Sequence, residues 1–98
     1  MSNRNGKVEI RDNIRNTLLE AVISGKSLQS TDIDDNKFMQ WFELSQIQIK
    51  KALNNSSYID SVESDYLGLL IQMLNKNIAP PKRLEYCIMY LTDIIDAI

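Results

Sequence analysis

The chain has no histidine among its 98 residues. Histidine is the commonest general base and metal ligand near neutral pH, so its absence removes serine–histidine and cysteine–histidine nucleophile pairs and most zinc, copper or iron sites. Asp32, Asp34 and Asp35 lack the spacing of a calcium loop, and we interpret them as helix-start and solvated charges. We predict no catalytic residue, no metal site and no cofactor, and therefore a binding protein rather than an enzyme.

Cysteine is almost as scarce. Cys87 is the only one, which excludes an internal disulfide and a thiolate metal cage. Apolar stretches are interrupted well before the roughly 18 residues that a membrane span requires. Residues 1–16 carry basic side chains among polar neighbours, unlike a signal peptide. We expect a protein of the reducing cytoplasm that does not enter a membrane.

Glycine and proline are also few, with three and two residues, which argues against hairpins, glycine-rich phosphate loops and disordered tails. The apolar and charged fractions, 44% and 24%, are those of ordinary globular proteins. A chain of this length has room for one core. We therefore predict a single domain over residues 1–98.

The apolar residues recur at helical spacing, and no alternating strand pattern competes with them. Gly25 follows the first apolar stripe and predicts its end, and Pro80–Pro81 predict the start of the last helix. The predicted helices cover residues 8–23, 35–42, 45–54, 62–76 and 81–97. The expected fold is all-α, a compact bundle of about five helices.

The second and third predicted helices have the pattern of a helix-turn-helix. Ser45 and Gln48 are spaced as a capping box, and Leu44 and Ile49 as the matching hydrophobic staple. Glutamine and asparagine suit adenine, isoleucine suits the thymine methyl, and lysine suits guanine or phosphate. The residues predicted to contact DNA are Ser45, Gln46, Ile47, Gln48, Lys50, Lys51 and Asn54.

Residues 8–55 resemble the DNA-binding half of GntR-type regulators. The resemblance rests on Leu-Leu-Glu-Ala-Val-Ile-Ser-Gly-Lys at 18–26, and on Phe-Glu-Leu-Ser at 42–45 leading into Ile-Lys-Lys-Ala-Leu at 49–53. It implies that Ser45, Gln46 and Lys50 approach duplex DNA. Residues 56–98 depart from the family, because they predict two further helices where the family has a β-wing.

The last predicted helix is apolar most of the way round, which is typical of a helix at the centre of a core or in an oligomer interface. We favour the interface, and a homodimer would let two recognition helices occupy two half-sites. This makes residues 56–98 a dimerisation half. The residues predicted for the interface are Leu84, Cys87, Ile88, Leu91, Ile94, Ile95 and Ile98.

Charge is divided unevenly along the chain: residues 1–51 carry +1 and residues 52–98 carry −3. We predict a small, dimeric, sequence-specific DNA-binding transcriptional regulator. The alternative is an acidic helical protein-interaction module, such as a secretion chaperone, an immunity protein or an antagonist of a basic partner. A positive surface at residues 45–54 would favour the first, and a large acidic surface around residues 60–98 the second.

Overall fold

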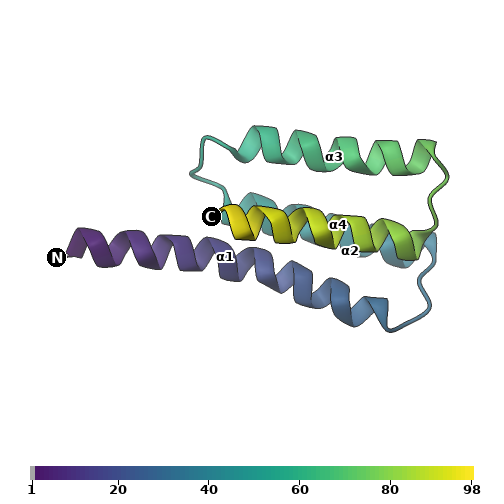
Figure 1. Cartoon of the computed structure of the whole chain (residues 1–98), viewed down its shortest axis with the longest axis horizontal. Coiled ribbons are helices and arrows are strands. Elements are labelled where there is room, and N and C mark those ends of the chain that lie inside the picture. The colour runs from purple at the N-terminus through teal and green to yellow at the C-terminus, as the bar shows by residue number, and fades with distance from the viewer. Residues whose placement is uncertain (1) are drawn as a thin grey trace.

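The computed structural model describes the backbone of residues 2–98 and the side chains of residues 10–98. Within that part of the chain all regular structure is helical. The four helices are α1 (Ser2–Gln29), α2 (Asp35–Ala52), α3 (Ile59–Asn75) and α4 (Pro80–Ala97), and they run alternately up and down (Figure 1). The predicted all-α class is confirmed, whereas the expected number of five helices is wrong.

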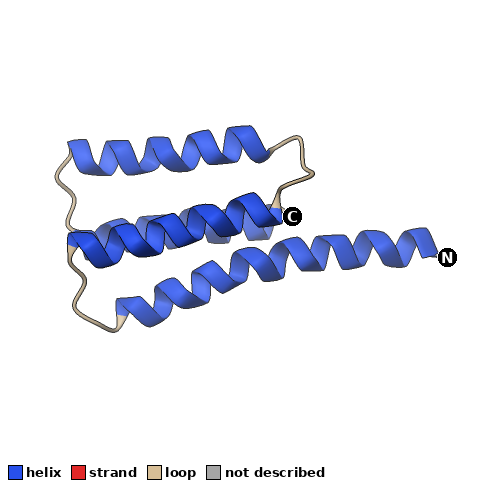
Figure 2. Ribbon diagram, turned by 180° about the vertical axis from the view of Figure 1, so that it is seen from behind, coloured by secondary structure: helices blue, strands red, loops and turns tan. Residues whose placement is uncertain are grey.

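The helices form an antiparallel bundle joined by short connections at residues 30–34, 53–58 and 76–79. Helix α1 packs against α2 and α4, and α3 packs against the same two helices from the other side. The first turns of α1 extend past the end of the bundle (Figure 2). At this end α2 and α4 finish and α3 begins.

Helix α1 does not end at Gly25, as the sequence pattern suggested, but continues to Gln29. Gly25 is buried and helical, and a Cβ atom there would lie 2.9 Å from Trp41 Cζ2 and 3.0 Å from Ile88 Cδ1. The glycine thus serves the close approach of three helices rather than a left-handed turn. Because Gly25 was interpreted as a helix end, the first predicted helix stopped at residue 23 rather than at Gln29.

Helix α2 is one continuous helix where a turn was expected at residues 43–44, so the predicted helix-turn-helix pair is absent. Asp34 caps its start by accepting a hydrogen bond from the Lys37 amide at 2.8 Å, as predicted for an aspartate at 34 or 35. Phe38, Phe42 and Ile49 lie on one buried stripe that keeps its phase through the expected break. No glycine or proline interrupts residues 35–52. The continuous apolar stripe therefore keeps residues 35–52 in one helix, and the capping-box spacing of Ser45 and Gln48 does not start a new one.

The two later helices were placed more accurately. Helix α3 begins at Ile59, a few residues before the predicted start. Asn77 follows its end with a φ of 55°, a left-handed conformation that asparagine tolerates better than most residues. Ala79 is extended, and Pro80 and Pro81 occupy the first turn of α4, as the sequence predicted.

An aromatic column fills the core between α2, α3 and α4. The rings of Phe42 and Tyr66 stack with centroids 4.5 Å apart, and Tyr66 stacks on Tyr90 at 5.5 Å. On the opposite side of α2, the Trp41 indole packs toward α1 and donates to the Ala21 carbonyl at 3.1 Å. Large rings therefore join α3 to the bundle, while small side chains bring α1 close to α2 and α4.

Candidate functional site

The residues predicted to read DNA do not share one exposed face. Ser45 is completely buried between α2 and α3. Gln48 points toward α1, where its side-chain amide donates to the Thr17 carbonyl at 3.2 Å and to Glu20 Oε2 at 2.6 Å. Both side chains therefore hold helices together.

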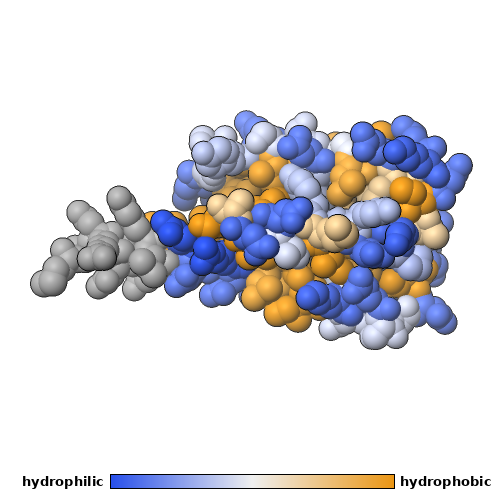
Figure 3. Space-filling model, in the orientation of Figure 1, coloured by the Kyte–Doolittle hydropathy of each residue, from blue (hydrophilic) through white to orange (hydrophobic). Residues whose placement is uncertain are grey.

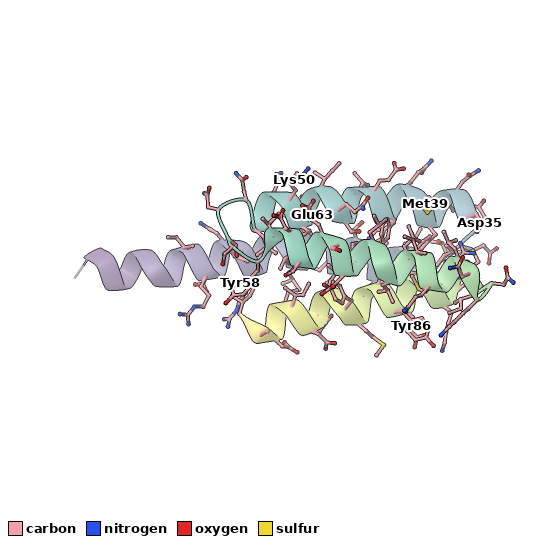
Figure 4. The ribbon with its side chains drawn as sticks, turned by 90° about the horizontal axis from the view of Figure 1, so that it is seen from above. Asp35, Met39, Lys50, Tyr58, Glu63 and Tyr86 are labelled. Atoms are coloured by element: carbon pink, nitrogen blue, oxygen red, sulfur yellow. The ribbon has the colours of Figure 1, made fainter. Side chains whose placement is uncertain are left out.

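The other five are Gln46, which is half-buried, and Ile47, Lys50, Lys51 and Asn54, which are exposed. Lys50 faces Glu63 of α3 across a gap of 4.0 Å, and the two point toward one another in Figure 4. Glu43 lies exposed on the same helix. Because carboxylates accompany the lysines, this region is mixed in charge rather than strongly basic.

The residues predicted for a dimer interface line the core of the single chain instead. Leu84, Cys87, Ile88 and Leu91 are buried against the other helices of the bundle. Ile94, Ile95 and Ile98 are half-buried and pack against the same core. Helix α4 is apolar most of the way round because it contacts α1, α2 and α3 at once. The four buried residues are therefore used within the single chain, whereas Ile94, Ile95 and Ile98 remain partly exposed.

Two linked hydrogen bonds join α3 to α2 inside the core. Ser45 Oγ lies 2.6 Å from the Phe42 carbonyl, to which it donates, and 2.6 Å from the Tyr66 hydroxyl. A serine has one hydroxyl proton, so Ser45 accepts from Tyr66. The Cys87 thiol of α4 lies close to the Tyr66 hydroxyl in the same buried cluster. Both buried hydroxyls, of Ser45 and Tyr66, have a hydrogen-bond partner.

These buried groups are not poised for chemistry. Burial raises the pKa of Cys87 to about 12, and the hydrogen bond with Tyr66 opposes that shift. Burial also raises the pKa of Tyr66, and the nearby Cys87 adds to the effect. The reactive form of a cysteine is its thiolate, and this thiol stays neutral and out of solvent. The arrangement serves the fold rather than a reaction.

A pocket of about 480 Å³ opens at the end of the bundle where α3 begins and α4 ends. Its wall is mainly apolar and comes from α1, α3, α4, the C-terminal Ile98 and the α2–α3 connection. The lining residues are Ile14, Leu53, Ser56, Tyr58, Ser61, Val62, Ile94, Ala97 and Ile98. The hollow remains because Ser56, Ser61 and Ala97 are too small to fill the space between diverging chain segments. Its size lies within the usual range for pockets that bind ligands.

Carboxylates flank this pocket on the α3–α4 side. Asp65 lies one turn beyond the lining residue Ser61, and Asp93 and Asp96 neighbour the lining residues of α4. Among described side chains, none of these three carboxylates has a cation within 4.0 Å. Burial raises the pKa of Tyr90, and the nearby Asp65 carboxylate adds to this effect.

The opposite end of the bundle holds the basic residues of α4. Arg83 is buried, and its guanidinium lies over the Phe38 ring. It donates one hydrogen bond to the Ile78 carbonyl at 2.6 Å and another to Asp35 Oδ1 at 2.7 Å. Lys82 pairs with Glu85 at 3.2 Å. In Figure 4, Asp35 lies at this end and Tyr58 at the pocket end. Among the described residues of α4, the basic side chains thus lie at one end of the bundle, whereas Asp93 and Asp96 lie near the pocket at the other end.

Within the described residues, no group of three or more cysteine, aspartate or glutamate side chains is arranged to hold a metal ion. In the same part of the chain, every helix is too short or too polar to cross a membrane. Comparison of the chain with family models, curated proteins and solved structures gives no match.

Proposed function

We propose that this protein is a helical protein-binding module that takes an apolar side chain of a basic partner segment into the pocket between α3 and α4. The observation that carries the proposal is an apolar hollow whose lining residues on α3 and α4 have exposed carboxylates within a turn of them. Ile14, Val62 and Ile94 give the pocket an apolar wall, and Asp65 and Asp93 flank it. Burial of an apolar side chain would supply affinity, and the carboxylates would select lysine or arginine beside it.

The net charge of α3 and α4 supports the proposal of a basic partner segment. Residues 59–98 contain six acidic and three basic side chains, a net charge of −3. Two of the basic residues, Lys82 and Arg83, lie at the far end in ion pairs. The field near the pocket therefore favours approach of a cationic segment, an effect that salt weakens.

The Tyr58 ring gives the pocket a second means of holding a cation, because Tyr58 lines the pocket and is 70% exposed. A lysine or arginine over an aromatic face gains cation–π attraction in addition to the attraction of a carboxylate. A basic amphipathic helix fits these requirements, since it presents apolar and cationic side chains about one turn apart.

The proposal is tested by fluorescence anisotropy with three labelled probes. The probes are a short lysine–leucine amphipathic peptide, the same peptide with glutamate for lysine, and random-sequence duplex DNA. We expect binding of the basic peptide alone, weakening as salt is raised. Equal binding of both peptides would contradict the charge argument. Binding of the duplex alone would favour the DNA-binding regulator predicted from the sequence.

Matched variants locate the peptide site. Ser61→Trp fills the pocket from an exposed helical position and should weaken peptide binding about tenfold or more, whereas Ser64→Trp, also exposed on α3, should not.

Replacing Asp65 and Asp93 together by lysine should abolish the salt-sensitive part of binding. The same charge change at the exposed Asp12 and Asp32 is the control. Peptide binding that survives Ser61→Trp would show that the pocket is not the site.

A further inference from the structure

A second hollow, of about 290 Å³, lies between α1 and the end of α2, next to the apolar pocket. The two hollows share the lining residues Ile14 and Ser56, so these side chains form the wall between them. On the face that carries α4, apolar residues are interspersed with hydrophilic ones rather than gathered in one area (Figure 3). The adjoining hollows therefore offer a partner segment two subsites at the same end of the bundle.

We call the second hollow the polar pocket, because most of its lining side chains are polar. The lining residues are Ile10, Asn13, Ile14, Thr17, Lys51, Ala52, Asn54, Asn55 and Ser56. Lys51 is exposed, and among the described side chains no carboxylate lies within 4.0 Å of its ammonium group. Lysine and asparagine side chains donate hydrogen bonds, and a donor binds more strongly when its acceptor is ionised. The polar pocket therefore has the chemistry of a carboxylate site.

We propose that the polar pocket binds an acidic side chain of the same partner segment whose apolar side chain fills the apolar pocket. Lys51 pairs with the carboxylate, and the amides of Asn54 and Asn55 donate to it. This inference rests on the proposed function and adds an order of charges to the partner. The apolar side chain lies between a basic residue on the side of α3 and α4 and an acidic residue on the side of α1 and α2.

The direction of the effect distinguishes this site from general electrostatic attraction. The chain has a net charge of −2, so a glutamate added to a partner should weaken binding unless a nearby cation holds the carboxylate. Lys50 does not supply that cation, because it faces Glu63 of α3 and does not line the polar pocket. A glutamate that strengthens binding therefore points to Lys51.

The test compares two labelled peptides by fluorescence anisotropy. Both have lysines on one side of a central leucine and a variable residue about one helical turn beyond it on the other side. The variable residue is glutamate in one peptide and glutamine in the other. We expect wild-type protein to bind the glutamate peptide about three- to fivefold more tightly, which is the size of an exposed ion pair. Raising the salt concentration should reduce this preference.

Variants of the protein assign the preference to the polar pocket. Lys51→Glu should reverse it, so that the glutamine peptide binds more tightly. Asn54→Asp, which adds a carboxylate to the lining, should remove most of it. Lys26→Glu is the matched control: it makes the same charge change at an exposed position of α1 outside both pockets, so the ratio of the two affinities should stay as in wild type. Circular dichroism checks that each variant is helical.

The outcomes separate this inference from the proposed function. Equal or tighter binding of the glutamine peptide to wild-type protein, or a preference that Lys51→Glu leaves unchanged, would overturn the carboxylate site. The proposed function would stand in that case if Ser61→Trp weakens binding of both peptides. Absence of binding by either peptide would overturn both proposals.

Discussion

The Tyr66 hydroxyl lies 2.6 Å from Ser45 Oγ, in the buried contact between α3 and α2. Ser45 accepts this hydrogen bond while donating to Phe42 within α2, so the Tyr66 hydroxyl has its acceptor only when the two helices have this register. A shift of one turn would leave the Tyr66 hydroxyl unpaired in an apolar core, which is costly. The pair therefore fixes the position of α3 along α2.

Ser45→Ala should destabilise the protein by about 1–3 kcal/mol, because it leaves the buried Tyr66 hydroxyl without its acceptor. The measurement is urea-induced unfolding followed by circular dichroism, which gives the free energy of unfolding. Ser57→Ala is the control, since Ser57 is exposed in the α2–α3 connection, and it should change stability little.

Tyr66→Phe separates the hydrogen bond from the serine itself. It removes the donor but leaves Ser45 bonded to Phe42, so it should cost less than Ser45→Ala. Combining the two substitutions should cost less than their sum, since the pair acts as a unit. Full additivity would argue against the coupling that we describe.

Gly25→Ala should destabilise the protein by about 1–2 kcal/mol although alanine is the better helix former. The added Cβ would lie 2.9 Å from Trp41, whose ring is held by its bond to Ala21, and 3.0 Å from Ile88. The measurement is the midpoint of thermal or urea unfolding.

Gly68→Ala is the matched control for that substitution. Its Cβ atom enters open space, so it should stabilise the protein by about 0.5–1 kcal/mol. Equal effects at both glycines would contradict the distinction between a close approach and an open position.

The contrast between α2 and the ends of the helices shows what the sequence could predict. Asp34, Pro80 and Pro81 mark helix starts through their own side chains, and these starts were predicted correctly. Ser45 is different, because a serine three residues before a glutamine occurs both at a helix start and inside a helix. Only its buried partner Tyr66, 21 residues away in the sequence, decides between them.

The candidate pocket could not be predicted from the sequence, for a related reason. Ile14, Val62 and Ile94 recur with other apolar residues at helical spacing, but such spacing does not show where packing between helices stops. The hollow depends on small residues from separate segments meeting at one end of the bundle. Arg83 was missed because a single arginine near a helix start gives no signal that it will be buried.

Arg83→Ala should destabilise the protein by about 2–3 kcal/mol, because it removes packing on Phe38 and two hydrogen bonds. Asp35→Ala should cost less than Arg83→Ala, about 1 kcal/mol, since the Asp35 side chain is 76% exposed and Arg83 keeps its packing on Phe38 and its hydrogen bond to the Ile78 carbonyl. Urea unfolding at low and high salt checks both: the Asp35 effect should shrink with salt, and most of the Arg83 effect should remain. An Arg83 effect that disappears in salt would show that its packing is unimportant.

Stability should fall at alkaline pH through the buried Cys87. Its pKa rises from an ordinary 9.0 to about 12 in the folded chain, so above pH 9 the unfolded chain loses a proton that the folded chain keeps. The free energy of unfolding should therefore decrease between about pH 9 and pH 12, by roughly 1.4 kcal/mol per pH unit for each such proton. Cys87→Ser keeps a hydroxyl group next to Tyr66. At pH values below those at which Tyr66 also titrates, it should remove this decrease in the free energy of unfolding. The same pH dependence in Cys87→Ser would show that other groups cause it.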